Sequence, residues 1–260
     1  MHSVSDPGPQ LGLAFAPSLV DFALMAESLP LLTQAVPVAE ICRRALLALH
    51  GVRSAMLAGK DASGTPLMEQ HRHAHYVPDC RGPDPLRMTH LVVYAPGGFA
   101  PSELRAMMSL TQLSRAAGPL AVVLQGMGRP DMLASSSRLF GSHRCFVSRT
   151  PFVLPRHRKR GDEPKDQLIR ELRLRGLPTP IHVARMHGLP APSQPLLPWS
   201  QFVIHRRYDE LTTCEHGFGF RIEFAEPVSG PLLLGYGCHY GLGQFIGAHE
   251  SNPPDEPPLP

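Results

Sequence analysis

The sequence predicts an α+β protein built from two successive modules, and three observations support this. An apolar run over residues 89–95, a helical pattern that begins at Pro101 and a second apolar run over 120–124 give the order strand, helix, strand. A helical pattern followed by apolar runs returns after residue 165. Residues 218–224 then alternate between apolar and polar or glycine positions, as in a half-buried antiparallel strand. Two mixed modules of this kind indicate a tandem pair of ferredoxin-like folds with a glycine-rich loop near the C-terminus.

The first module begins with an amphipathic helix. Apolar residues recur at helical spacing after Pro37, and His50 and Gly51 give a stop signal. The run over 89–95 predicts a buried strand that ends at a Pro-Gly-Gly turn. The next helix should run from Pro101 to the Gly-Pro pair at 118–119, and a strand should follow over 120–124. Further short strands are expected at 146–147 and 152–154.

The second module follows a basic stretch. A charged helix is expected over residues 167–175, ended by the Gly-Leu-Pro sequence at 176–178. Strands are expected through 181–184 and 202–204, and the alternating strand over 218–224 leads toward the glycines. The resulting division is an irregular leader over 1–36, a first domain over 37–150, a second domain over 151–248 and a disordered, proline-rich tail over 249–260.

Composition limits the class of protein. The chain has 260 residues of which 43% are apolar, enough for a substantial core. Its 5 cysteines lack CxxC spacing, which argues against a zinc ribbon or a disulfide scaffold and favours a reducing compartment. No apolar run approaches the roughly 20 residues that span a bilayer, and no secretory signal opens the chain. We therefore expect a soluble, cytoplasmic protein without a membrane partner.

Positive charge is unevenly distributed. The first 40 residues contain no Lys or Arg, whereas residues 141–185 are rich in both. A local basic surface suits a phosphate polymer, although a solvated loop and helix face would give the same pattern. The residues expected to bind RNA here are Arg144, Arg156, His157, Arg158, Lys159, Arg160, Arg170 and Arg173.

The glycine-rich segment over residues 235–245 has two interpretations. Its glycines are interleaved with aromatic residues and His239, so its backbone could approach a ligand that the aromatic rings stack on. The spacing matches neither a dinucleotide fingerprint nor an NTPase phosphate loop, and a glycine-rich hairpin packed under aromatics is the alternative. Placed after the basic stretch, the segment is expected to contact the RNA backbone through Gly235, Gly237, His239, Gly241 and Gly243.

Four motifs occur in order along the chain. They are His-Arg-His-Ala-His-Tyr-Val-Pro at 71–78, Thr-His-Leu-Val-Val-Tyr-Ala-Pro at 89–96, Thr-Pro-Phe-Val at 150–153 with Arg-His-Arg-Lys at 156–159, and Pro-Val-Ser-Gly-Pro-Leu at 227–232. Together they resemble the CRISPR-associated repeat-RNA endoribonuclease family of the RAMP superfamily, in the variant found in type I-U (also called I-G) systems. The resemblance covers roughly residues 29–248.

This resemblance implies a function and partners. Members of the family consist of two ferredoxin-like, RNA-recognition-type modules, and the second carries a glycine-rich loop. They cut the repeats of precursor CRISPR RNA without a metal or another cofactor. The expected partners are therefore the repeat RNA, its mature CRISPR RNA product and other Cas proteins of a type I interference complex.

The histidines suit metal-free RNA cleavage independently of the resemblance. This chemistry needs a base for the ribose 2′-OH, donors for the phosphorane and an acid for the leaving oxygen, and histidine can supply or take a proton near neutral pH. On an extended segment His71 and His73 would share a face, which His75 continues. We expect His71 or His73 to be the general base, with His90 as a further candidate and Tyr76 as a positioning donor.

Other interpretations remain open at this stage. Any one of these histidines could be structural. The His-x-His spacing also suits a metal ion, but Asp79, Cys80 and Asp84 nearby show no recognisable ligand spacing, so no metal site is expected. A non-catalytic RNA-binding subunit of the interference complex would use the same folds and basic surface.

Overall fold

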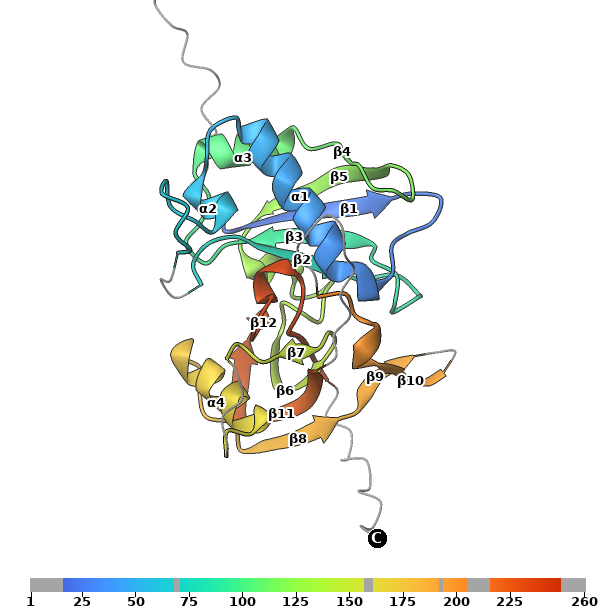
Figure 1. Cartoon of the computed structure of the whole chain (residues 1–260), viewed down its shortest axis with the longest axis vertical. Coiled ribbons are helices and arrows are strands. Elements are labelled where there is room, and N and C mark those ends of the chain that lie inside the picture. The colour runs from blue at the N-terminus through green and yellow to red at the C-terminus, as the bar shows by residue number, and fades with distance from the viewer. Residues whose placement is uncertain (1–15, 68–70, 157–160, 192–193, 205–215, 249–260) are drawn as a thin grey trace, which may run out of the picture.

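The protein was analysed as a computed structural model. The structure describes all residues except 1–15, 68–70, 157–160, 192–193, 205–215 and 249–260, so the expected disordered tail lies outside the described residues. Two antiparallel sheets lie one above the other, and the chain completes the upper sheet before it builds the lower one (Figure 1). Among the described residues, no helix is both long and apolar enough to cross a bilayer.

The first unit is a βαββαβ arrangement. Its sheet has the order β2-β3-β1-β5-β4, and every neighbouring pair is antiparallel. The strands are β1 (Leu19–Met25), β2 (His75–Asp79), β3 (His90–Tyr94), β4 (Gln112–Leu113) and β5 (Leu120–Gly128), and the helices are α1 (Ala35–His50), α2 (Ala55–Ala58) and α3 (Pro101–Met108), with 3-10 turns η1 (Leu32–Gln34) and η2 (Pro130–Leu133). Without the short β4, this is the strand order of a ferredoxin-like fold.

The second unit repeats that strand order but lacks a helix in its second crossover. Four of its strands lie in the order β13-β6-β11-β8, and α4 connects β6 to β8. Its elements are β6 (Ser142–Ser148), β7 (Phe152–Val153), α4 (Pro164–Leu174), β8 (His182–Met186), β11 (Gly217–Ser229), β12 (Leu232–Leu233), η4 (Cys238–Tyr240) and β13 (Gln244–Gly247); a separate ribbon of β9 (Gly188–Ala191) and β10 (Gln194–Pro198) precedes η3 (Trp199–Gln201). Residues 230–243 stand where a second helix would connect β11 to β13, and they contain only β12 and η4.

The first sheet is buried on both faces at β1, β2 and β3, whereas one face of β5 is exposed. One face carries Val20 and Phe22 against α1 and α3, in a core that contains the buried stripe of α1. Alternate residues of the same strands point to the opposite face, because side chains of a strand alternate. There Leu19, Val77 and Val92 share a second core with residues of the second unit, namely Leu233, Cys238 and Ile246. This shared core fixes the glycine-rich segment against β2.

The two-module α+β prediction is confirmed, and so are these expected helices and strands: α1, β3, β5, α4, β8 and β11. The irregular leader is wrong, because β1 within it is a central strand of the first sheet. Its sequence shows no alternation since both faces of the strand are buried, including Asp21, which pairs with Arg81 at 2.8 Å.

Three further details differ from the prediction. Strand β6 pairs in the second sheet, so the boundary placed at residue 150 falls too late. Helix α3 ends at Met108, because the segment that follows pairs with β5 as β4. Residues 202–204 form no strand: Phe202 ends η3 inside the core, and the backbone N–H of Val203 donates to Thr33.

Candidate functional site

Four histidines meet where the two units join. His71 and His73 lie in the turn before β2, His75 begins β2, and His239 comes from η4 of the second unit. The His239 ring stacks on His75 with 3.7 Å between centroids and on His73 with 3.8 Å, and its centroid lies 5.2 Å from that of His71. The expected common face of the three upstream histidines is observed. The fourth ring is the one assigned from sequence to RNA binding.

Local contacts hold the turn that carries His71 and His73. His71 adopts a left-handed backbone with φ of 54°. The carbonyl of Arg72 accepts from the N–H of Gly97, and the N–H of Ala74 donates to Met56. Gly59 leaves room for the His73 ring, since a Cβ there would lie 2.6 Å from it. The turn is therefore tied to the first unit on both sides.

Glycines shape the loop that delivers His239. Gly237 and Gly241, both left-handed, flank η4. A Cβ on Gly241 would lie 2.7 Å from Pro78, and one on Gly243 would lie 1.7 Å from the carbonyl oxygen of Leu234. The expected RNA contact through the loop glycines is wrong, because all four are buried against the protein itself: Gly235, Gly237, Gly241 and Gly243. They allow η4 to reach β2 instead (Figure 1).

A chain of hydrogen bonds orients His71. Nδ1 of His239 lies 3.1 Å from the carbonyl oxygen of Ala74, and Nε2 of His239 lies 2.9 Å from Nδ1 of His71. Because a carbonyl only accepts, Nδ1 of His239 carries the hydrogen, and its Nε2 accepts from Nδ1–H of His71. The lone pair of neutral His71 is then on Nε2. This is the arrangement of a base oriented by a second side chain.

The cluster favours neutral imidazoles. Burial, followed by the nearby His73 and His71, lowers the pKa of His75 well below 6.5. Burial, followed by His75 and His73, does the same to the pKa of His239. The pKa of His71 is lowered by burial and by the positive charge of Arg175. Neutral imidazoles can accept protons or bind metal ions at neutral pH.

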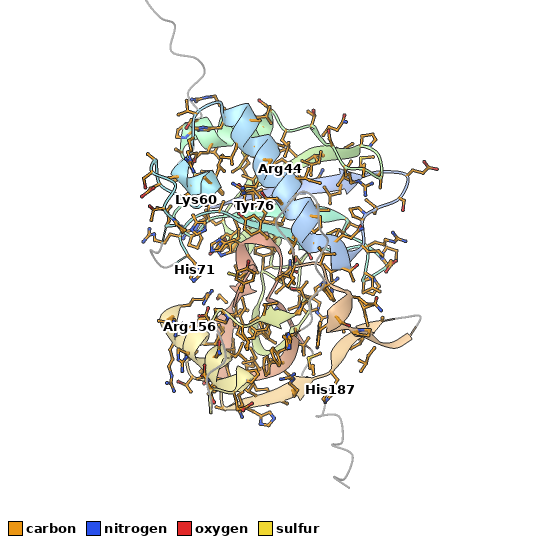
Figure 2. The ribbon with its side chains drawn as sticks, in the orientation of Figure 1. Arg44, Lys60, His71, Tyr76, Arg156 and His187 are labelled. Carbon is orange, nitrogen blue, oxygen red and sulfur yellow. The ribbon has the colours of Figure 1, made fainter. Side chains whose placement is uncertain are left out.

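His71 and His75 line a cleft of about 600 Å³ between the units. The C-terminal turn of α4 contributes Arg173 and Arg175, and residues 229–233 form the opposite wall. Arg175 pairs with Glu171 at 2.6 Å, whereas Arg173 is exposed. In Figure 2 His71 lies at the junction of the upper and lower units. The cleft therefore combines a proton acceptor, His71, with the positive charge of Arg173 and Arg175.

Comparisons with known proteins are limited. No family model matches the chain, and no curated protein matches it significantly. Among solved structures, a Cas6 product complex aligns with 90% of this chain and 99% of its own, at 14% identity and a TM-score of 0.42.

Two predicted catalytic residues lie outside the cluster. Tyr76 points to the opposite face of β2, is 1% exposed and donates its hydroxyl to the carbonyl of Leu57 at 2.9 Å, so it is a core residue. His90 pairs with Asp79 at the other end of the β2–β3 ladder, and its Nδ1 lies 2.9 Å from the hydroxyl of Thr89. The structure therefore contradicts the roles expected for Tyr76 and His90.

The predicted RNA-binding residues are dispersed. Arg144 on β6 pairs with Glu226 at 3.5 Å, and Arg170 on α4 pairs with Asp162 at 3.3 Å. Arg156 is exposed after β7, and Arg173 alone lines the cleft. The remaining four lie outside the described residues: His157, Arg158, Lys159 and Arg160.

Sequence reasoning missed the role of Arg175 and of Cys238. Arg175 was one of many arginines in the basic stretch, and only its position at the end of α4 brings it to His71. One Arg175 nitrogen lies 3.8 Å from the sulfur of Cys238, a residue more than sixty positions away. No local spacing pattern could have indicated this contact.

The cluster also contains a possible metal-ligand set. One ligand atom from each of His71, His75, Cys238 and His239 lies within 4.8 Å of the others. Nδ1 of His75 is buried without a hydrogen-bond partner in the described structure. Three imidazoles and a thiolate are typical ligands of Zn²⁺. The third and fourth ligands, which could not be found near residue 71, come from η4.

Proposed function

We propose that this protein is an endoribonuclease that cleaves precursor CRISPR RNA within its repeats, by attack of a ribose 2′-OH and without a metal ion. The observation that carries the proposal is the hydrogen-bond chain that leaves Nε2 of His71 free beside a basic cleft. The assignment to CRISPR repeats and to the type I-U or I-G variant rests on the sequence motifs. Residues from three of the four motifs line this one cleft, including His71, Tyr94 and Ser229.

The geometry supports a specific first step. Nε2 of His71 takes the proton of the 2′-OH while the 2′-oxygen bonds to the adjacent phosphorus. The bond from phosphorus to the 5′-oxygen breaks, that oxygen takes a proton from water, and the hydroxide that remains takes the proton of the His71 imidazolium. The products are a 2′,3′-cyclic phosphate and a 5′-hydroxyl. His239 keeps accepting from Nδ1–H of His71, which stabilises the imidazolium that forms.

Two arginines supply positive charge for the phosphorane. Arg173 is exposed at the cleft and can contact the phosphate directly. Arg175 is closer to the histidines, but its ion pair with Glu171 offsets part of its charge. Arg173 is therefore the better candidate for substrate contact, and Arg175 for holding η4 through Cys238.

The test is cleavage of the repeat RNA from the neighbouring CRISPR array in excess EDTA. We expect cleavage with a cyclic-phosphate 3′ end, and no cleavage when the ribose at the cut carries 2′-deoxy. Binding without any cleavage would favour a non-catalytic RNA-binding subunit. The proposed partners are this RNA, its mature product and other Cas proteins of a type I complex, and the proposed location is the cytoplasm.

A second candidate function is a metal-dependent hydrolase. The ligand set of His71, His75, Cys238 and His239 favours it, since a bound metal could activate water in the same cleft. Activity lost in EDTA and restored by Zn²⁺ would support this candidate and contradict metal-free cleavage. The 2′-deoxy substrate separates the two mechanisms again, because a metal-activated water does not need the 2′-OH.

A further inference from the structure

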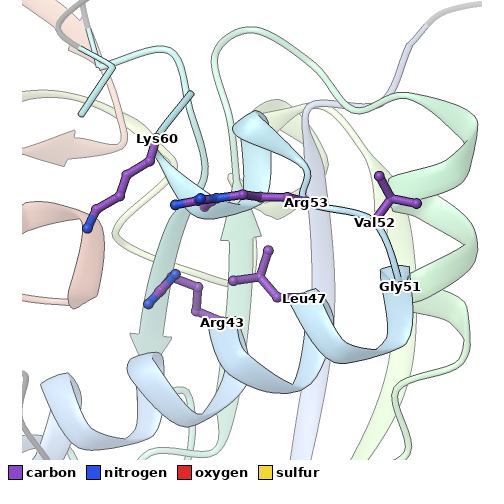
Figure 3. Close-up of a pocket in the computed structure, with 7 residues that line it drawn as sticks. Arg43, Leu47, Gly51, Val52, Arg53 and Lys60 are labelled. Carbon is purple, nitrogen blue, oxygen red and sulfur yellow. The ribbon is translucent and has the colours of Figure 1, made fainter. Parts of the chain in front are cut away.

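A second basic pocket lies on the first unit, apart from the histidine cleft. Its volume is about 360 Å³, and α1, the turn after it and α2 form its walls. The lining residues are Arg43, Leu47, Gly51, Val52, Arg53, Ala58 and Lys60. Figure 3 shows the cationic ends of Arg43, Arg53 and Lys60 directed to the same side. The lining contains no acidic residue.

The positive charge of this pocket is only partly compensated. Arg43 makes two hydrogen bonds to the Glu40 carboxylate, at 2.9 and 3.2 Å. Arg53 and Lys60 are exposed and form no ion pair with any described residue. Two exposed cations on one rim attract an anion to the space between them. The remaining side chains of the lining are apolar, so the three cations are its only charged or hydrogen-bonding side chains.

The pocket is connected to the histidine cluster through the tip of the glycine loop. The guanidinium carbon of Arg43 lies 5.9 Å from the ring centre of Tyr240, whose ring in turn stacks on Tyr76 at 6.3 Å. Tyr240 directly follows His239, and consecutive Cα atoms are about 3.8 Å apart. One residue of η4 thus belongs to the histidine cluster while the next contacts the wall of the basic pocket.

We propose that this pocket binds the phosphate backbone of the repeat RNA on one side of the scissile phosphate. The identity of the RNA rests on the proposed function. The pocket offers three cationic side chains and no acidic side chain, which suits contact with phosphates of the backbone. A strand whose scissile phosphate lies at His71 continues past Tyr240 to Arg53 and Lys60.

The proposal is tested by RNA binding to the double variant Arg53→Ala/Lys60→Ala. The probe is the repeat RNA with a 2′-deoxyribose at the mapped cleavage site, or the unmodified RNA if the protein does not cleave it. The readout is therefore independent of catalysis. We expect about ten-fold weaker binding, and a slope of log K against log salt that falls by roughly 1.4, from about 0.7 per phosphate contact on a single strand. The matched control is Arg105→Ala/Arg129→Ala, two exposed arginines outside both pockets, which should bind as wild type.

Truncated RNAs then locate the contact. The affinity difference between wild type and the double variant should vanish when nucleotides are removed from one side of the cut, and should persist when they are removed from the other. An unchanged slope, or a loss that is equal for every truncation and for the control variant, overturns the proposal. If wild-type protein does not bind the repeat RNA at all, the proposed function fails as well.

Discussion

The two units have the same strand order but differ in their last crossover. The first unit connects β3 to β5 through α3, and this helix covers a core. The second connects β11 to β13 through residues 230–243, which carry η4 and no α-helix. The first unit is therefore the more complete scaffold and supplies three histidines, while the second gives up a helix and supplies the loop that completes the cluster. A site between two related modules can arise by modifying one connection.

The largest expected effect is on the cleavage rate when His71, which the first unit contributes, is replaced. His71→Ala removes the proposed base and should lower the single-turnover cleavage rate by about 10²- to 10⁴-fold, with RNA binding within a few fold of wild type. His182→Ala, an exposed histidine on β8, is the control and should cleave normally. Full activity in His71→Ala would remove the basis of the mechanism.

The next effect concerns the second unit's loop. Gly243→Ala places a Cβ 1.7 Å from a backbone oxygen at a φ of 59°, so the backbone must shift. We expect a loss of about 2–4 kcal/mol in the free energy of unfolding, measured by urea denaturation. Gly118→Ala is the matched control, because its φ is 93° but nothing lies within 4 Å of the added Cβ, and it should cost about 1–2 kcal/mol. Equal losses would show that the loop does not pack tightly.

The smallest effect tests the connection between the units. The wild-type rate should fall on the acid side with a midpoint below pH 6.5, because a base must be unprotonated and burial lowers the pKa of His71. His239→Ala should reduce the rate about ten- to a hundred-fold, because the acceptor that orients His71 and stabilises its imidazolium is lost.

His239→Asn is the informative companion variant. Its amide oxygen can still accept from Nδ1 of His71, so it should retain more activity than His239→Ala. An unchanged rate in both variants would mean that His239 packs beside His71 without orienting it.

The sequence predicted those elements whose periodicity reflects one buried face. Helix α1 and strand β11 have such a face, and both were found. Strands β1 and β3 are both buried on both faces and so lack the alternation that marks a strand. Strand β3 was found from its unbroken apolar run, whereas Asp21 interrupts the run of β1. The His71–His75 motif was visible because it is local. Its meeting with His239 was not, since the contact joins residues 168 positions apart and depends on the packing of two sheets.

The shared core of Leu19, Val77 and Val92 with Leu233, Cys238 and Ile246 has a consequence for biosynthesis. Its members come from both ends of the described chain, so the histidine cluster cannot assemble until residue 246 has emerged from the ribosome. A nascent first unit would leave one face of its sheet uncovered and would hold three histidines without their partner. The complete cluster thus appears only after the second unit has been translated.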